Sequence, residues 1–312
     1  MIFLNSFKVM FYNFSLAIKS FITKLLSLLI VAGVIFAVAF GPLQLLAHNG
    51  LFDTIWQGLV SFNFLTFFDS LIAGQQIIID TIAASDLVFK TKLIVMLAVA
   101  YFLIVTICNF DKVPMCEVLD AKMSSNCKLN FTGVYFSRFW FSIKYTLTSL
   151  IFFVPIDAAV LAGIYFSLKL YAIGGVWLTI SPFVVIMVTI ILISLRISLL
   201  SNWVPQCVAS GKGVWKSFGK SVKITSKKFL RTFINAVFLV LTVFLVSILM
   251  FILTAGVGLL LTAPATILLI NSFSMVNYYV STGNRFYVDG ETIVSPKKLE
   301  TQEEIKNLID LI

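Results

Sequence analysis

The stretch LLSLLIVAGVIFAVAFGPLQLLA, residues 25–47, carries no charged side chain. It is long enough to cross a lipid bilayer as one helix, because a crossing takes about 20 mostly apolar residues. Over the whole chain 60% of the residues are hydrophobic and 12% are charged, whereas soluble domains carry about 25% charged residues. Five further apolar stretches lie at about residues 93–109, 145–168, 176–200, 233–255 and 257–280. The sequence therefore predicts an all-α, polytopic membrane helical bundle with six transmembrane helices within residues 25–280.

The distribution of Lys and Arg predicts how this bundle lies in the membrane. No Lys or Arg occurs from residue 25 to residue 89, whereas residues 212–231 contain seven and no acidic residue. Short cytoplasmic loops of membrane proteins are enriched in Lys and Arg. We therefore expect a multi-pass protein of the cell membrane, with loops 110–144 and 201–232 and both termini on the cytoplasmic side.

Residues 54–74 form a seventh apolar stretch. A crossing there would place residues 212–231 outside the cell, which the charge rule disfavours. We therefore interpret residues 51–83 as amphipathic helices that lie on the outer face or dip into it. Trp56 and the nearby phenylalanines suit such an interface.

Both ends of the chain are predicted to lie outside the bundle. Residues 1–24 place apolar side chains at helical intervals, which predicts a cytoplasmic amphipathic helix that either lies in the plane of the membrane or packs on the bundle. Residues 281–312 predict a cytoplasmic tail with a hairpin that turns at Asp289-Gly290 and a short helix that begins at Thr301. The apolar edge of that helix would dock on the protein's own cytoplasmic face or on a protein partner. We favour the first, because an apolar stripe is uncommonly left exposed.

The loop between the fourth and fifth spans carries cations three or four residues apart: Lys216, Lys220, Lys223, Lys227 and Arg231. Trp215, Phe218, Val222 and Phe229 fall on another side of the same predicted helix. Such a helix can lie on the anionic inner leaflet, where each cation near a lipid headgroup contributes about 1 kcal/mol. The same charges also enforce the topology. The two interpretations are compatible, and we name these five cations as candidate contacts to lipid headgroups.

Three polar residues inside the predicted spans are candidates for a functional or structural role. Asp157 lies deep in the third span, where a carboxylate costs several kcal/mol unless it is neutralised, paired or hydrated. It is therefore either a functional residue or a hydrogen-bonded link between helices. Arg196 lies near the inner end of the fourth span and can extend its charge to the interface. Asn271 in the sixth span is expected to hydrogen bond to neighbouring helices.

The sequence contains no recognisable catalytic, metal or cofactor site. His48 is the single histidine, so Ser–His–Asp and Cys–His catalysis have no identifiable base. Cys116, Cys127 and Cys207 lack the closely spaced ligand pairs of zinc sites. The net charge of +9 comes with no nucleic-acid recognition motif. We therefore expect neither an enzyme nor a nucleic-acid partner.

A short motif occurs twice, as VPMC at residues 113–116 and VPQC at residues 204–207. Each copy follows a predicted span and precedes a basic loop and another span. Transporters often contain internal repeats, but proline also ends helices in unrelated segments. We attribute the repeated motif to chance or to shared helix-ending chemistry.

The run GVWKSFGKS at residues 213–221, together with Val204-Pro205 ahead of it, resembles a group of bacterial six-span membrane proteins. That group is similar to the membrane domain of glycerophosphodiester phosphodiesterases. The resemblance implies a six-span membrane fold. It does not carry over the phosphodiesterase reaction, because the catalytic domain has no counterpart in this chain.

Two functions follow as hypotheses. The first is a non-catalytic accessory or scaffold protein that engages lipid or a partner through its basic cytoplasmic face. The alternative is a transporter or channel for a small polar solute or ion that uses Asp157. A membrane enzyme acting on lipid has the least support, since a single histidine and one buried acid make a poor active site.

Overall fold

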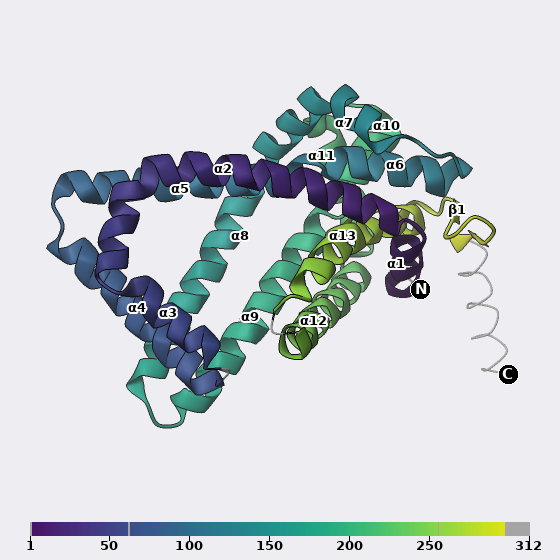
Figure 1. The fold of residues 1–312 in the computed structure, drawn as a ribbon. Coiled ribbons are helices and arrows are strands. Elements are labelled where there is room, and N and C mark those ends of the chain that lie inside the picture. The colour runs from purple at the N-terminus through teal and green to yellow at the C-terminus, as the bar shows by residue number, and fades with distance from the viewer. Residues whose placement is uncertain (1, 62, 255, 297–312) are drawn as a thin grey trace, which may run out of the picture. The chain divides into compact units, whose positions relative to one another are not determined.

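The computed structural model describes residues 2–61, 63–254 and 256–296. Figure 1 shows that helices make up most of this part of the chain. The helices are α1 (Ile2–Tyr12), α2 (Phe14–His48), α3 (Leu51–Val60), α4 (Phe64–Ala84), α5 (Leu87–Phe110), α6 (Lys112–Ser125), α7 (Phe131–Ser137), α8 (Phe139–Ile173), α9 (Trp177–Leu200), α10 (Trp203–Ser210), α11 (Val214–Lys227), α12 (Phe229–Thr254) and α13 (Leu259–Thr282). Two short strands follow, β1 (Phe286–Tyr287) and β2 (Ile293–Val294).

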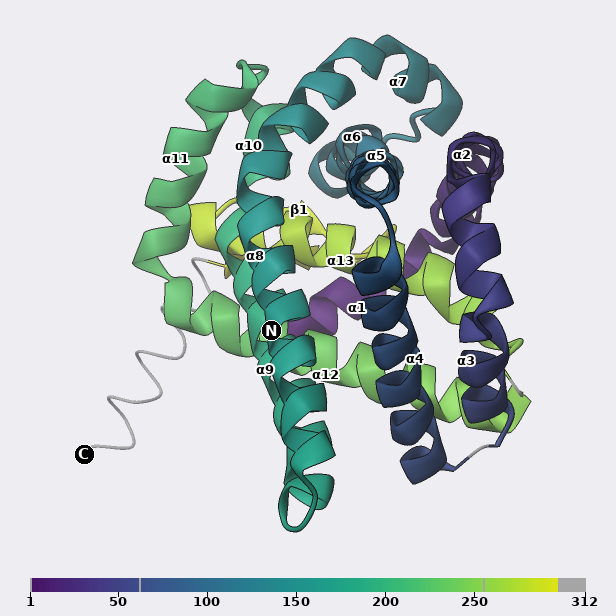
Figure 2. The ribbon, with the colours of Figure 1, turned by 90° about the vertical axis from the view of Figure 1, so that its left-hand side faces the viewer.

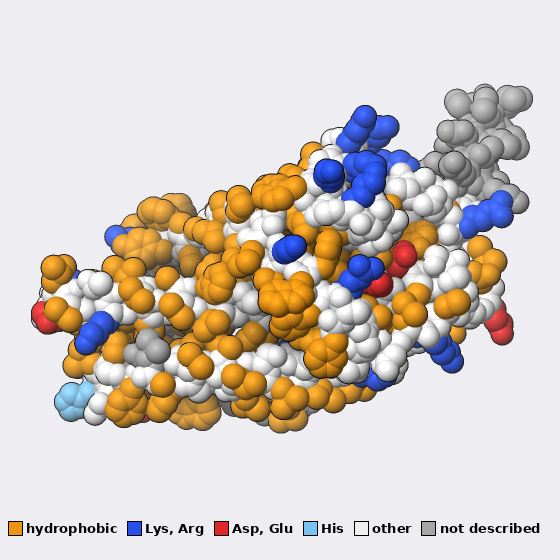
Figure 3. Space-filling model, turned by 90° about the horizontal axis from the view of Figure 1, so that it is seen from above, with side chains coloured by type: hydrophobic (Ala, Val, Ile, Leu, Met, Phe, Trp, Pro, Cys, Tyr) orange, Lys and Arg blue, Asp and Glu red, His pale blue; other side chains and the backbone are white. Residues whose placement is uncertain are grey.

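The predicted fold class is confirmed. Within the described residues, six helical segments are long and apolar enough to cross a membrane: Phe14–Ala37, Leu87–Ser125, Phe139–Ile173, Thr179–Ser210, Phe229–Thr254 and Leu259–Thr282. Each overlaps one predicted span. The protein is therefore an all-α, multi-pass membrane protein. Figure 3 shows one face of the chain, on which hydrophobic side chains predominate and Lys and Arg side chains gather into clusters.

Several helices extend beyond the apolar stretch that predicts them. Residues 14–24, assigned from the sequence to a separate cytoplasmic helix, are the first turns of α2. The break before them is confined to Asn13, whose Nδ2 donates to the Val9 carbonyl at 2.8 Å. A long helix can continue past its apolar core because Lys19 and Lys24 reach polar surroundings with their head groups.

The chain divides into two compact units. The first unit comprises Met1–Lys24, Cys108–Ile156 and Ile190–Ile312, and the second comprises Leu25–Ile107 and Asp157–Thr189. In the first unit, α1 packs on α12 and α13, and α6 packs on α10 and α13. Its core contains the fully buried side chains of Trp203, Phe273 and Met115.

In the second unit, α3 and α4 form an antiparallel helical hairpin, as Figure 2 shows. The two helices approach so closely that a Cβ atom on Gly58 would lie 1.8 Å from Ser70 Oγ. Asn63 begins α4 by accepting a hydrogen bond from the Leu65 amide at 3.0 Å. Residues 51–83, predicted to be amphipathic helices, thus form this hairpin, and neither helix is among the candidate spans in the described residues. A position on the outer face of the membrane stays a prediction.

The residues after α13 contain a two-stranded antiparallel ladder. Phe286 pairs with Val294, and Tyr287 pairs with Ile293. Asp289 holds the turn between the strands by accepting hydrogen bonds from the amides of Glu291 and Thr292 and from the Thr292 hydroxyl. The predicted helix that begins at Thr301 lies outside the described residues.

The two copies of the Val-Pro-x-Cys motif begin helices rather than end them. In α6 and in α10, the proline is the third helical residue, where its missing N–H is tolerated in the first turn. The residues before these helices, Asp111 and Asn202, have almost the same backbone angles (φ −86°, ψ −3° and φ −88°, ψ −5°). The order span, short helix, loop helix, span thus occurs twice, in α5–α8 and in α9–α12. Of the two explanations of the motif, shared helix-ending chemistry is wrong, because the proline lies in the first turn of a new helix; chance is not tested.

Candidate functional site

Helix α11 packs on the first unit along one narrow side. The buried residues recur at helical intervals and are small: Val214, Ser217, Ser221 and Thr225. The indole N–H of Trp203 donates to the Val214 carbonyl, and Asn202 Nδ2 donates to Thr225 Oγ1, both at 3.0 Å. These bonds hold the two ends of α11 against α10 and the residue before it.

The other sides of α11 are exposed and differ in character. All the cations named as candidate lipid contacts are exposed: Lys216, Lys220, Lys223, Lys227 and Arg231. The four lysines are spaced four, three and four residues apart, so they share one side of α11. Trp215 and Val222 lie seven residues apart on a third side and are 58% and 44% exposed. An interfacial helix has this combination of an apolar side, a cationic side and a side that contacts the protein.

A second cationic surface lies elsewhere in the first unit. Lys19 of α2, Lys122 of α6 and Lys128 in the following loop line a groove of about 400 Å³. The Lys122 ammonium lies 5.6 Å from the centre of the Tyr12 ring at the opposite wall of the groove. Lys19 is far in the sequence from Lys122 and Lys128, so no local pattern brings it to them. The groove adds positive charge to the surface of the same unit.

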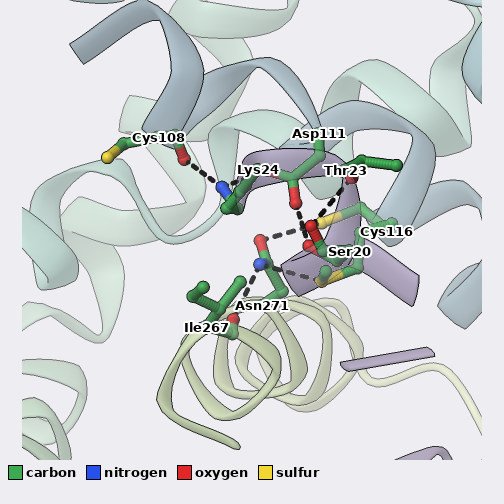
Figure 4. A network of polar contacts seen from close by, with 9 residues as sticks. Ser20, Thr23, Lys24, Cys108, Asp111, Cys116, Ile267 and Asn271 are labelled. Carbon is green, nitrogen blue, oxygen red and sulfur yellow. Dashed lines mark hydrogen bonds and ion pairs between the residues drawn. The ribbon is translucent and has the colours of Figure 1, made fainter. Parts of the chain in front are cut away.

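Asp111, between α5 and α6, is the centre of a buried polar cluster (Figure 4). Lys24 Nζ lies 2.6 Å from Asp111 Oδ1 and also donates to the Cys108 carbonyl at 2.8 Å. The Ser20 hydroxyl donates to the other carboxylate oxygen. The side chain of Asp111 is only 3% exposed and that of Lys24 13%. Sequence reasoning missed this pair, because nothing local connects residue 24 to residue 111.

Helix α13 contacts the starts of both repeated short helices through asparagines. Asn271, predicted to hydrogen bond between helices, donates from Nδ2 to Met115 Sδ at 3.1 Å and accepts from Cys116 Sγ at 3.8 Å (Figure 4). Asn277 donates to Ser201 Oγ at 3.0 Å and to Asn202 Oδ1 at 3.1 Å. Asn271 thus links α13 to α6, and Asn277 links α13 to the residues just before α10.

Arg196 of α9 lies in the first unit against an aromatic ring. Its guanidinium carbon is 3.9 Å from the centre of the Phe153 ring, which is 1% exposed. Lys112 Nζ lies 5.2 Å from the centre of the same ring. Arg196 and Asn271 also line one cavity together with Lys112. Arg196 and Asn271, two of the three predicted intramembrane polar residues, therefore line the same cavity.

Asp157 lies in the second unit, on α8. Its Oδ2 accepts a hydrogen bond from the Tyr101 hydroxyl of α5 at 2.8 Å, and the side chain is partly buried. This contact connects two predicted spans of that unit. It gives Asp157 the helix-linking geometry that was one of the two interpretations of this residue.

Arg138, which lies between α7 and α8 outside the candidate spans, forms an ion pair with Glu117 of α6. Arg138 donates from Nε and from Nη2 to Glu117, at 2.7 and 3.0 Å. These hydrogen bonds raise the pKa of the Arg138 guanidinium. Burial, assisted by the negative charge of Asp111, raises the pKa of Tyr135.

Among the residues that the structure describes, no group of three or more His, Cys, Asp or Glu side chains is placed to hold a metal ion. The four cysteines are free thiols, of which Cys116 and Cys207 are buried. Comparisons of the chain with protein families, curated proteins and solved structures found no match. Any functional argument therefore has to come from the residues themselves.

Proposed function

We propose that this chain is a multi-pass protein of the cell membrane that acts without catalysis, as an accessory or scaffold protein, and that binds anionic lipid through the cationic side of α11. The observation that carries the proposal is the three-sided character of α11. Its Ser and Thr side contacts the protein, Trp215 and Val222 are exposed for insertion between lipids, and four lysines share a further side. In this arrangement both termini and α11 lie on the cytoplasmic side.

Electrostatic attraction supports the proposal quantitatively. Each cation near an anionic leaflet contributes about 1 kcal/mol. The interaction weakens beyond a Debye length of about 10 Å at 0.1 M salt, so only cations held close to the headgroups contribute. The Lys19, Lys122 and Lys128 groove offers three more cations on the first unit.

The resemblance to bacterial six-span proteins forms part of the same proposal. The run that carries it, residues 213–221, includes Val214, Ser217 and Ser221, which are the packed side of α11. The resemblance includes residues through which α11 packs on the rest of the first unit. It therefore supports the same packing of the corresponding helix in those six-span proteins. It supports no phosphodiesterase chemistry.

The alternative, transport of a small polar solute or ion, depends on Asp157. The Tyr101–Asp157 hydrogen bond favours a structural role for that carboxylate. We therefore treat transport as an outcome to be tested and not as a second proposal.

The decisive experiment compares lipid binding by two triple variants. One replaces Lys216, Lys220 and Lys223 of α11 with Gln, and the control replaces Lys90, Lys92 and Lys169 of the second unit. Each protein is purified in mild detergent, and its bound phosphatidylglycerol and phosphatidylethanolamine are quantified by mass spectrometry. Loss of about 3 kcal/mol predicts a roughly 100-fold weaker preference for the anionic lipid in the α11 variant alone. Equal retention in both variants, or equal loss, would reject the proposal.

The orientation has its own test. A cysteine replaces Trp215 in a chain whose exposed thiols, Cys108 and Cys127, are changed to Ser. A membrane-impermeant maleimide applied to intact cells should leave it unlabelled, and labelling should appear only after the cells are opened. Labelling in intact cells would place α11 outside and contradict the proposed topology.

A further inference from the structure

A small cavity lies inside the first unit, among α6, α8, α9, α10 and α13. Its volume is about 50 Å³. One water occupies about 10–15 Å³ on this measure, so the cavity has room for roughly three or four water-sized groups. Its polar wall is formed by Lys112, Tyr145, Arg196, Ser201 and Asn271. The size suits one small polyatomic group and not a whole lipid.

The charge of the wall is positive. Lys112 and Arg196 both contribute to it, and no Asp or Glu is among its described lining residues. Asp111, the neighbour of Lys112 in the chain, is bound to Lys24 and Ser20. Within the described residues the Lys112 ammonium contacts the Phe153 ring and is attracted by the Asp111 carboxylate, but it makes no hydrogen bond and no ion pair within 4 Å. A partly buried ammonium without an acceptor is costly unless an anion or water joins it.

Tyr145 adds an independent observation. The side chain is 2% exposed, and its ring packs edge-on against Trp203 with the ring centres 5.2 Å apart. Tyr145 lines the cavity, and its hydroxyl makes no hydrogen bond to any described residue. Buried tyrosine hydroxyls usually have a partner. The cavity that Tyr145 lines together with Lys112 and Arg196 offers space for such a partner.

We propose that this cavity binds one oxyanion group, a phosphate, held by Lys112, Arg196 and the Tyr145 hydroxyl. Lysine, arginine and a phenol all donate hydrogen bonds, and donors to an ionised oxygen make the stronger bonds. The phosphate belongs either to a lipid headgroup or to free inorganic phosphate. The inference does not rest on α11, because the α11 lysines lie on exposed sides of that helix and line no part of the cavity.

The test measures phosphate binding in two arms. In the first, radiolabelled inorganic phosphate is titrated onto the protein in nanodiscs of neutral phosphatidylcholine. In the second, the protein is taken from nanodiscs that contain phosphatidic acid, and the lipid it retains is counted by native mass spectrometry. The variants are Lys112→Gln and Tyr145→Phe, with Lys144→Gln and Tyr165→Phe as controls, since Lys144 and Tyr165 are exposed on the same helix as Tyr145.

Loss of one charge-assisted hydrogen bond should weaken binding about 10-fold or more in each cavity variant and leave the controls unchanged. Loss in the first arm identifies free phosphate, and loss in the second alone identifies a lipid phosphate. The conservative Tyr145→Phe change keeps the ring packed. Phosphate binding by this variant therefore still tests the proposal if Lys112→Gln fails to fold. The proposal is wrong if the wild type binds neither probe, or if cavity variants and controls behave alike. The α11 triple variant should still bind at this cavity, which separates the two proposals.

Discussion

The two units of the chain keep their helices together in different ways. The first unit buries a large continuous core, and its interior also holds Asp111, Asn271 and Asn277. The described core of the second unit is small, centred on Leu93 and Met96. Many of its large apolar side chains are exposed, among them Leu87 at 79% and Ile173 at 71%.

The first unit therefore packs many of its apolar side chains against one another, whereas the second unit leaves many of them to contact lipid. Between helices in a bilayer there is no hydrophobic driving force, because lipid tails are as apolar as leucine. The second unit must therefore depend on close contacts such as Gly58 on Ser70 and on a few hydrogen bonds. The first unit adds buried polar contacts that are costly to break singly. Changes inside the first unit should consequently have the larger effects.

The largest effect is expected at Asp111. Asp111→Asn leaves the Lys24 ammonium buried without its counter-charge, and breaking a buried pair from one side costs about 3–5 kcal/mol. The measurement is the free energy of unfolding in detergent, from a denaturant titration followed by tryptophan fluorescence. We expect a large fall in the midpoint.

The control for Asp111 is the exposed pair in the same unit. Glu117→Gln removes one partner of Arg138, whose side chain is 44% exposed, and surface pairs contribute about 0–1 kcal/mol. The double change Lys24→Met with Asp111→Leu should regain most of the lost stability, since apolar replacements of buried pairs are often neutral. Equal effects of Asp111→Asn and Glu117→Gln would contradict the central role of the buried cluster.

In the second unit, the close approach of α3 and α4 is the most sensitive contact. Gly58→Ala places a Cβ 1.8 Å from Ser70 Oγ and 2.5 Å from Ser70 Cβ, and such overpacking costs about 1–3 kcal/mol. Hydrogen exchange of α3 and α4 should rise. Adding Ser70→Gly should restore protection, and Gly33→Ala, which meets open space, should have no such effect. A hairpin that tolerates Gly58→Ala unchanged would mean that its helices do not pack at this point.

How much of this architecture the sequence predicts depends on whether a contact is local. The apolar runs predict six spans because a helix of about 20 apolar residues is long enough to cross the hydrocarbon core of a bilayer. The lysine spacing predicts a helix within residues 212–231, since side chains three and four residues apart share one side. Both kinds of signal lie within one segment, and the six helical spans are found where the runs are.

The tertiary contacts have no such signal. Lys24 meets Asp111, and Lys112 shares the Phe153 ring with Arg196, but the partners lie on different helices and at no fixed spacing. The start of α2 at Phe14 was also missed, because residues 14–24 mix apolar and basic side chains and resemble a separate amphipathic helix. The repeated Val-Pro-x-Cys motif was the one available hint that α6 and α10 are related.

A smaller effect is expected from the hydrogen bond between Tyr101 and Asp157. Intramembrane hydrogen bonds average about 0.6 kcal/mol in double-mutant cycles. A cycle of Tyr101→Phe and Asp157→Asn should therefore give a coupling energy near that value, measured by thermal unfolding in detergent. If instead Asp157→Asn leaves stability unchanged but abolishes flux of a small ion or solute into vesicles, the transport alternative is correct and Asp157 is more than a helix link.

The smallest effect is expected at the turn held by Asp289, which belongs to the first unit but is partly accessible to water. Hydrogen bonds from the backbone of Thr292 and Glu291 lower the pKa of Asp289 below its ordinary value of about 3.9. A carboxyl whose pKa is depressed on folding stabilises the folded turn above its unfolded pKa and loses that contribution as pH falls through the folded value. Exchange of the Thr292 amide, corrected for its intrinsic rate, should therefore be slow at pH 7 and accelerate only below about pH 4.

Asp289→Asn should remove this pH dependence. If the wild-type turn stays equally protected below that pH, the carboxylate does not hold it. A clear dependence with little change in global stability would show that exposure to water, and not membership of the first unit, decides how much a polar contact contributes.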